Sequence, residues 1–377
     1  AAIEAGFQVA LMAPTEILAE QHYLKFSQWL QPLGVRIAWL SGSLKKRAKD
    51  AAKADMANGS TQLAIGTHAL FQDDVAFHNL GLVIVDEQHR FGVAQRLALK
   101  DKGADVHQLM MSATPIPRTL AMSFFADLDV SVIDELPPGR TPIKTKLVNN
   151  ARRAEVEGFV RHTVAQGRQV YWVCPLIEES ETLQLQTATD THAQLQAAFA
   201  DLHVGLVHGR LKAAEKAAVM QAFSSGSLHI LVATTVIEVG VDVPNASLMV
   251  IEHAERMGLA QLHQLRGRVG RGAVASVCVL LFAEPLSDLA KARLQVIYEH
   301  TDGFEIARQD LNIRGPGEFL GARQSGAPML RFANLEEDLP LLEAARNLAP
   351  QLLAQQPEVV DKHLSRWLAS REHYLGA

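Results

Sequence analysis

The feature that most constrains the fold is an apolar run at residues 82–85 (Leu-Val-Ile-Val), which leads directly into four polar residues. Three of its residues are β-branched, and such a run predicts a strand buried on both faces of a parallel sheet. Open α/β sheets bind ligands at the carboxyl ends of their strands, where Asp86 and Glu87 stand. One of two adjacent carboxylates can hold Mg²⁺, often through water, and the other can orient an attacking water. A strand leading into a charged turn explains this stretch equally well when it is taken alone.

The flanking segments predict that this strand belongs to a parallel α/β domain, because strands and helices alternate. The expected strands are 7–13, 35–40, 62–65 and 108–111, and the expected helices are 16–30, 44–57 and 93–100. The sequence opens without Met, on six residues that resemble the last turns of a helix closed by Gly6. We therefore expect the first domain to be truncated at its N-terminus and the sequence to belong to a longer protein.

A proline-rich connector separates this domain from a second one. Residues 134–142 contain three prolines and one glycine, which make a stiff, non-helical segment. We assign residues 1–135 to the first domain, 136–142 to the linker, 143–283 to a second α/β domain and 284–377 to a mostly helical region. The second domain should contain strands 143–147, 169–174, 204–207, 229–233, 248–251 and 276–282, with helices 151–165, 181–200 and 213–223. A glycine-rich loop at 314–321 interrupts the helical region.

Composition excludes several classes of protein. The net charge of −5 argues against a generally basic protein that coats nucleic acid, so any contact with DNA must come from local patches. The two cysteines, Cys174 and Cys278, stand inside apolar strand-like runs and indicate buried, reduced thiols in a cytoplasmic protein. No apolar run approaches the ~20 residues that span a bilayer, and no signal peptide is present, so we expect no membrane partner.

Small polar residues follow other predicted strands. Ser112, Ala113 and Thr114 end the strand after the Asp-Glu pair, so they should lie at the same sheet edge and could pass a change at a phosphate to another domain. Thr234 and Thr235 begin a segment whose hydroxyls can bind a nucleic-acid backbone. Gly240 and Asp242, later in that segment, can approach a ribose. Taken alone, each segment is also explained as a strand end with capping residues.

Arginine and glycine alternate at residues 264–272 (Gln-Leu-Arg-Gly-Arg-Val-Gly-Arg-Gly). The glycines allow tight turns, and the arginines at 266, 268 and 271 present planar, permanently charged donors. Guanidinium groups that approach a γ-phosphate from a second domain stabilise the charge that develops there. A plain basic surface loop is the alternative, which the regular spacing after a helix disfavours.

Three further groups suit contacts with a phosphate backbone. Helix N-termini and hydroxyls hold phosphates without reading base sequence. The candidate residues are Thr15 and Glu16 at one helix start, Thr67 and His68 at another, and Arg210 in a His-Gly-Arg segment. Ordinary helix capping explains each of them individually.

In this order, the motifs resemble those of superfamily 2 helicases, which are ATP-driven motors built from two RecA-like domains. Residues 13–16 match motif Ia, 86–89 motif II, 112–114 motif III, 234–242 motif V and 264–271 motif VI. Within that class, the segments 86–96, 115–119 and 136–140 are similar to the RecG family of DNA helicases. Residues 310–318 and 324–326 resemble the TRG segment that RecG shares with the transcription-repair coupling factor Mfd, and Gln88 with Pro316 favours RecG.

This resemblance implies ATP and Mg²⁺ as cofactors and assigns roles to the residues that match. Asp86 would bind Mg²⁺ through water and Glu87 would activate the hydrolytic water. Arg268 and Arg271 would stabilise the γ-phosphate, which Gln264 helps to sense, and Gly240 and Asp242 would serve the nucleotide and the domain interface. Residues that couple hydrolysis to movement would be Gln88, His89, Ser112, Ala113, Thr114, Arg314 and Gln324.

The resemblance also implies branched and double-stranded DNA as partners, together with a single-stranded-DNA-binding protein, and a parent protein that is monomeric. Its function would be fork reversal and branch migration of Holliday junctions in recombination and repair. Three alternatives remain: an Mfd-like translocase recruited by RNA polymerase, an RNA helicase, and a nucleic-acid-binding module without motor activity. A non-motor module should have lost Glu87 or the arginines, and it has not.

One departure from the family pattern matters for activity. The P-loop of such motors, G-x-x-x-x-G-K-[ST], does not occur in these 377 residues, and neither does the DNA-binding wedge domain. Without the P-loop the phosphates lose most of the electrostatic positioning that phosphoryl transfer needs. We therefore expect these residues by themselves to be deficient in ATP hydrolysis. Sheet surface exposed by the missing strand should also favour self-association.

Overall fold

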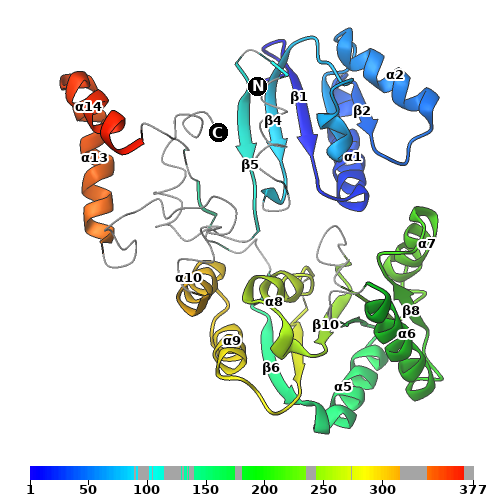
Figure 1. The fold of residues 1–377 in the computed structure, drawn as a ribbon. Helices are drawn as coiled ribbons and strands as arrows, with labels where there is room; N and C mark the ends of the chain where they lie inside the picture. The colour runs from blue at the N-terminus through cyan, green and yellow to red at the C-terminus, as the bar shows by residue number, and fades with distance from the viewer. Residues whose placement is uncertain are drawn as a thin grey trace. The chain divides into compact units, whose positions relative to one another are not determined.

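The structure is a computed structural model, shown in Figure 1. It describes residues 1–88, 91, 102–103, 105–113, 129, 131–133, 135, 140–174, 181–234, 243–272, 274–314 and 338–368. The chain forms two compact units: Ala1–Thr114 with Leu136–Ile306, and Pro115–Glu135 with Ala307–Ala377. Two parallel sheets lie in the first unit, and helices follow them toward the C-terminus. The predicted fold class, two parallel-sheet α/β domains followed by a helical region, is confirmed.

The first sheet has the strand order β2-β3-β1-β4-β5, and its neighbouring strands pair in parallel. Its strands are β1 (Gln8–Met12), β2 (Ile37–Leu40), β3 (Leu63–Gly66), β4 (Leu80–Val85) and β5 (His107–Met110). Helices α1 (Glu16–Leu30) and α2 (Lys46–Ala57) and the 3-10 turns η1 (Gln31–Leu33) and η2 (His68–Phe71) connect them. Strand β1 lies in the centre with all five residues buried, as an apolar run in a parallel sheet requires.

Strand β4 begins two residues earlier than the sequence indicates, and the cause is steric. Gly81 is typical of a turn, but it continues the strand here. A Cβ at this position would lie 2.6 Å from the ring of Phe7, so the glycine lets Phe7 pack directly on the strand backbone. The predicted helix at 93–100 lies outside the described residues.

The second sheet has the strand order β6-β11-β10-β7-β9-β8, again with parallel pairs. Its strands are β6 (Lys144–Asn149), β7 (Gln169–Val173), β8 (Val204–Val207), β9 (Ile230–Ala233), β10 (Ala246–Ile251) and β11 (Val277–Phe282). The helices associated with it are α5 (Arg153–Ala165), α6 (Glu181–Ala198), α7 (Ala213–Ser224), α8 (Leu259–Arg266) and α9 (Asp288–Glu299), with the turns η4 (Asn150–Arg152) and η6 (Ala254–Arg256).

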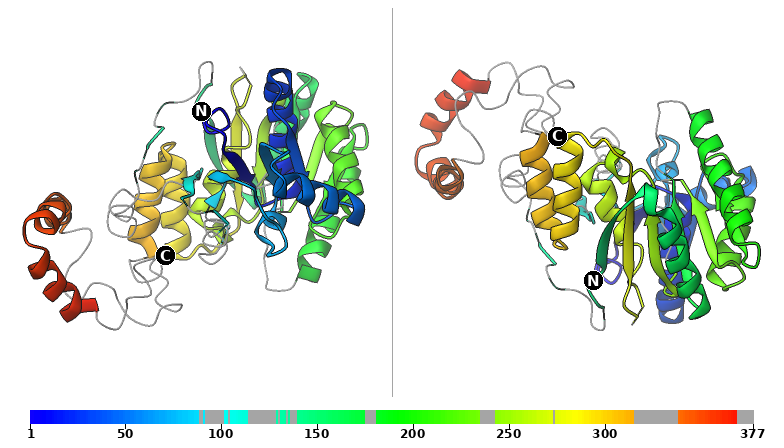
Figure 2. Two further views of the ribbon diagram at one scale, coloured as in Figure 1. Left: turned by 90° about the horizontal axis from the view of Figure 1, so that it is seen from above. Right: turned by 90° about the horizontal axis from the view of Figure 1, so that it is seen from below.

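Helices cover both faces of this second sheet (Figure 2). Val160 of α5 and Leu195 of α6 share one buried cluster with Trp172 of β7. On the other face, Tyr171 of the same strand contacts Phe223 of α7, with ring centroids 4.9 Å apart. Burial on both faces explains why the inner strands of this sheet, such as β9 and β10, are visible in the sequence as apolar runs.

The remaining helices are α10 (Gly303–Arg314), α13 (Leu339–Gln355) and α14 (Pro357–Leu368), of which α13 and α14 pack against each other. The predicted glycine-rich loop begins at Arg314, the last residue of α10, and the rest of it lies outside the described residues. Among the described residues, no helix is long and apolar enough to cross a bilayer. Cys174 and Cys278 are buried free thiols as expected, and burial raises the pKa of each to about 12.

Gly66, at the end of β3, provides a test of how closely strands β2 and β3 pack against each other. A Cβ added there would lie 2.1 Å from the carbonyl oxygen of Leu40 on β2, so the two strands would have to separate. We expect Gly66→Ala to lower the free energy of unfolding by at least about 2 kcal/mol. Urea denaturation of the purified chain measures this change.

Gly158, inside α5, is the matched control. A Cβ there meets nothing within 4 Å, so Gly158→Ala should raise the free energy of unfolding by about 0.5–1 kcal/mol through helix propensity. Equal stability of the two variants would show that strands β2 and β3 are not held as closely as described.

Candidate functional site

The predicted polar residues of the first domain meet at one edge of its sheet. Strands β3, β1, β4 and β5 lie side by side and run parallel, so their carboxyl ends share that edge. There, Thr67 follows β3, Thr15 follows β1, the Asp86–Glu87 pair follows β4 and Ser112 follows β5. Parallel pairing therefore brings together four segments that are far apart in the sequence, at the position where open sheets bind ligands.

Asp86 is oriented by contacts on both of its carboxylate oxygens. Its Oδ1 accepts a hydrogen bond of 2.9 Å from the backbone N–H of Glu87, and its Oδ2 lies 2.8 Å from Nε2 of His22. Its own N–H donates to the carbonyl of Met12 on β1. His22 is a site residue that the sequence analysis missed. It stands seven positions after Thr15, on the same face of α1, and this helical spacing was the signal that could have found it.

Glu87 has an unusual backbone conformation. Its φ of +52° lies in the left-handed region, which costs a residue with a side chain about 1 kcal/mol or more. The side chain is nevertheless only 7% exposed. The next residue, Gln88, fixes this bend because its N–H donates to the carbonyl of Met111 after β5. A buried carboxylate held on a strained backbone is typical of a functional position rather than of a plain charged turn.

The candidate DNA contacts of the first domain differ in exposure. Thr15 caps α1, because its hydroxyl accepts a hydrogen bond from the N–H of Leu18 at 3.3 Å. The Glu16 carboxylate accepts one from the N–H of Ser43 at 3.0 Å. Thr67 is 2% exposed, and its buried hydroxyl has no hydrogen-bond partner among the described residues. His68 is exposed.

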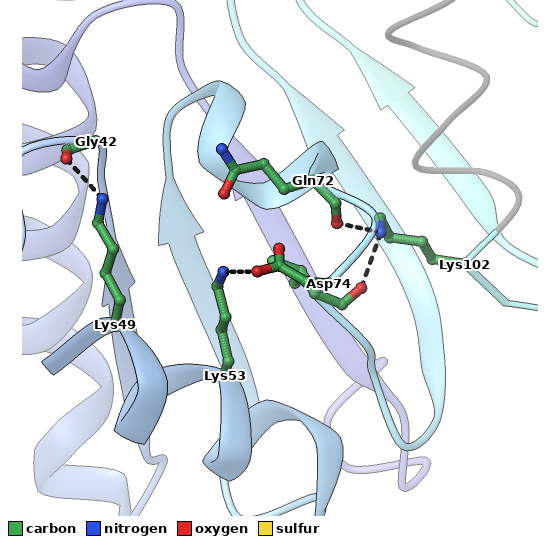
Figure 3. Close-up of polar contacts among 7 residues, drawn as sticks. Gly42, Lys49, Lys53, Gln72, Asp74 and Lys102 are labelled. Atoms are coloured by element: carbon green, nitrogen blue, oxygen red, sulfur yellow. Dashed lines mark hydrogen bonds and ion pairs between the residues drawn. The ribbon is translucent and has the colours of Figure 1, made fainter. Parts of the chain in front are cut away.

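Three lysines of the first domain bond to the loops that follow strand β2 and turn η2 (Figure 3). Lys49 donates to the carbonyl of Gly42 at 2.7 Å, and Lys53 pairs with Asp74 at 2.5 Å. Lys102 donates to the carbonyls of Gln72 and Val75 at 2.9 and 2.8 Å. The hydrogen bond from Lys53 lowers the pKa of the Asp74 carboxyl, and burial lowers the pKa of Lys102. These contacts make the lysines part of the scaffold of the first domain.

In the second sheet, the predicted arginine loop follows α8. Arg268 is 7% exposed, whereas Arg271 is exposed and its Nε donates to the carbonyl of Gly267 at 3.4 Å. Val269, between them, is completely buried and anchors the loop to the domain. Gln264, on α8, is half-buried.

Arg266 has a different role from the two arginines that follow it. It is 3% exposed, and its NH1 donates to the carbonyls of Ile297 and His300 at 2.8 Å each. Its NH2 donates to the carbonyl of Thr301 at 3.3 Å and lies 3.1 Å from Nδ1 of His263. These carbonyls belong to the C-terminal end of α9 and the turn after it, so Arg266 caps that helix.

The other candidates of the second domain are placed only in part. Thr234 is buried after β9, and its N–H donates to the carbonyl of Val207 at 3.3 Å, while Arg210 is exposed. Ser112 and Ala113 follow β5, and Arg314 ends α10. The predicted site residues that lie outside the described residues are His89, Thr114, Thr235, Gly240, Asp242 and Gln324.

The oxygen ligands after β4 fit Mg²⁺ of the kind that accompanies nucleotides. Among the described residues, no group of three or more His, Cys, Asp or Glu side chains is placed to hold a metal ion. Mg²⁺ at nucleotide sites needs only one or two carboxylates, because water and substrate phosphates complete its octahedral shell. The half-buried Asp86 carboxylate satisfies that requirement.

Comparison with known protein families gives three matches along the chain. Residues 1–123 match the DEAD/DEAH box helicase model, and residues 153–273 match the helicase conserved C-terminal domain. Residues 300–366 match the C-terminal part of domain 3 of ATP-dependent DNA helicase RecG.

Individual relatives agree with these matches. ATP-dependent DNA helicase RecG of Acidithiobacillus ferridurans is 59% identical over 373 residues, covering 99% of this chain and 54% of the relative. The protein of the same name from Escherichia coli (strain K12) is 56% identical over 381 residues, covering 100% of this chain and 55% of the relative. The chain thus spans about half the length of the curated relatives it matches.

Solved structures show the same relationship. A structure of RecG bound to a three-way DNA junction is 48% identical, with a TM-score of 0.69, and the match covers 90% of this chain and 44% of that one. Dbp5 of S. cerevisiae, bound to RNA and ADP BeF3, has a TM-score of 0.57 at 15% identity, covering 82% of this chain and 81% of that one, and shares the fold alone.

Two RecA-like parallel sheets, an Asp-Glu pair after a central strand of the first and an arginine loop in the second define a helicase core of superfamily 2. The resemblance noted in the sequence is confirmed at this level. Within the class, the chain belongs to the RecG family of helicases.

His263 makes the stability of the arginine-loop region depend on pH. Burial, and then the charge of Arg266, lowers the pKa of His263 to about 4 from an ordinary value of 6.5. The unfolded chain therefore binds more protons than the folded chain between these values, and stability is lost as the pH falls through this window. We expect this group to cost roughly 3 kcal/mol of unfolding free energy between pH 7 and pH 4.

The His263→Asn variant isolates this effect, because an amide oxygen can still accept the hydrogen bond from Arg266 but does not titrate. Urea denaturation at both pH values should show a smaller loss for the variant than for the parent chain. Identical losses would mean that folding does not lower the pKa of His263.

Proposed function

We propose that this chain is the motor part of an ATP-dependent DNA helicase that remodels branched DNA by translocating on duplex. The observation that carries the proposal is the Asp86–Glu87 pair, held at the carboxyl edge of a parallel sheet with Glu87 on a strained backbone. The RecG structure bound to a three-way DNA junction supports branched DNA as the partner. Fork reversal and branch migration of Holliday junctions would be its work in repair and recombination.

In this proposal the candidate residues of the two domains that serve ATP have separate roles. Glu87 takes part in activating the attacking water, because its carboxylate is buried beside the position of the phosphates. Asp86 holds Mg²⁺ through water, and bound Mg²⁺ neutralises phosphate charge. Arg268 and Arg271 supply positive charge to the γ-phosphate, and Gln264 contacts it. Gly240 and Asp242 serve the nucleotide.

The DNA backbone would be held by residues at the carboxyl ends of strands and at helix starts, which contact phosphates without reading sequence. The proposed contacts are Thr15, Glu16, Thr67, His68, Arg210, Thr234 and Thr235. Coupling of hydrolysis to movement would use Gln88, His89, Ser112, Ala113, Thr114, Arg314 and Gln324. We further propose a cytoplasmic, monomeric parent protein that also meets a single-stranded-DNA-binding protein.

ATP hydrolysis tests this function directly. These 377 residues contain no P-loop, so alone they should hydrolyse ATP no faster than a Glu87→Gln control, with or without branched DNA. A longer chain that adds the P-loop should hydrolyse ATP, and branched DNA should stimulate it. Phosphate release from both chains, measured with junction and linear duplex DNA, gives the comparison.

Glu87→Gln in the longer chain should lower kcat by at least about a hundredfold while ATP still binds. Turnover by the 377 residues alone that disappears with Glu87→Gln would contradict the dependence on a P-loop. A longer chain that binds junctions but never hydrolyses ATP would support a nucleic-acid-binding module instead of a motor.

A further inference from the structure

Arg140, at the end of the proline-rich connector, contacts the loop that carries the proposed phosphate-binding arginines. Its Nε donates to the carbonyl of Gly270 at 2.9 Å, and its NH2 donates to the carbonyl of Gly267 at 3.2 Å. These two carbonyls stand on either side of Arg268 in the sequence. A single planar guanidinium therefore fixes both ends of the segment 267–270, through two donors that its rigid plane holds in a fixed relative geometry.

A steric contact brings the connector and the loop together independently of these hydrogen bonds. Gly270 has a φ of +73°, and a Cβ there would lie 2.9 Å from Cγ1 of Ile143, three residues after Arg140. The glycine thus lets the connector approach the backbone of the loop closely. On its other side, the loop is anchored by the completely buried Val269.

The short segment that follows Arg140 has little freedom. Lys144 begins β6, where its N–H donates to the carbonyl of Ser276 at 3.0 Å and the strand pairs with β11. Only three residues separate this fixed point from Arg140. The segment 140–144 is therefore held at both ends. Arg140 bonds to the arginine loop, and Lys144 bonds to the second sheet.

The carbonyl of Gly267 is shared. It accepts from Arg140 and also from Nε of Arg271, at 3.4 Å. The position of the Gly267 carbonyl therefore affects both arginines that are proposed to bind phosphate. Arg268 is the next residue in the chain, and Arg271 donates a hydrogen bond to this carbonyl. Arginine groups that stabilise a transition state lose their effect when they are misplaced by about 1 Å.

We propose that Arg140 is a positioning residue that holds Arg268 and Arg271 in place by fixing the carbonyls of Gly267 and Gly270. It makes the placement of the two arginines depend on docking of the connector. This inference rests on the phosphate-binding role proposed above for Arg268 and Arg271. In this proposal the Arg140 guanidinium acts on the loop backbone and not on ATP or DNA.

The first experiment needs no ATP hydrolysis. Hydrogen exchange of residues 266–272 is measured in the 377-residue chain and in Arg140→Ala, Arg140→Lys and Arg152→Ala. Arg152 is the matched control, because its exposed guanidinium pairs with Glu155 on the surface of the same domain. Exchange should rise about tenfold in Arg140→Ala and less in Arg140→Lys, whose ammonium group keeps donors for the carbonyls but lacks the rigid planar geometry of the guanidinium. Unchanged exchange in Arg140→Ala, or an equal rise in Arg152→Ala, overturns the inference.

The second experiment uses the longer chain with the P-loop and junction DNA. Arg140→Ala should lower kcat by roughly ten- to a hundredfold and leave KM for ATP within about twofold. A double-mutant cycle separates positioning from general damage: in a background that carries both Arg268→Ala and Arg271→Ala, the effect of Arg140→Ala should vanish. Additive losses, or an unchanged kcat in Arg140→Ala, overturn the inference. If the unsubstituted longer chain itself does not turn over, the proposed function fails, and hydrogen exchange alone decides whether Arg140 holds the loop.

Discussion

Parallel pairing of the strands determines where the chemistry of this chain can lie. In a parallel sheet, every strand ends at the same edge, so the polar residues that follow β3, β1, β4 and β5 are neighbours although up to 97 positions separate them, from Thr15 to Ser112. The central strands, such as β1 and β10, are buried along their whole length and offer no chemistry. The carboxyl edge is the one place where backbone groups and side chains are both open to a ligand.

The apolar runs were sufficient to predict the central strands of both sheets, because strands buried on two faces are hydrophobic along their length. The edge strands β5 and β6 are partly exposed and more polar. The same logic predicted that Asp86 and Ser112 would share an edge. It could not predict β4 to begin at Leu80, since Gly81 is explained only by the ring of Phe7 packed against it. Residue type gives the general form of the fold, and steric contacts between distant residues give its exact boundaries.

The residues that orient the site were not predictable for a related reason. His22 and Asp86 are 64 positions apart, and Arg140 and Gly270 are 130 positions apart. Two of the groups that Arg140 contacts are backbone carbonyls, which carry no signature in the sequence. Side chains that perform chemistry stand in short motifs after strands, whereas side chains that hold them in place are chosen by three-dimensional proximity. Sequence analysis therefore finds the former and misses the latter.

The arginine loop shows that residues of one type can have different roles within a single motif. Arg266, Arg268 and Arg271 have the same side chain within six residues, yet Arg266 is used up by the carbonyls at the end of α9, Arg268 is buried and Arg271 is exposed. Arg266 fixes the loop to α9 from one side, and Arg140 fixes it to the connector from the other. A loop held by two distant segments is expected to shift with them, so the placement of Arg268 and Arg271 would be linked to whatever shifts the connector or the helices after the sheet.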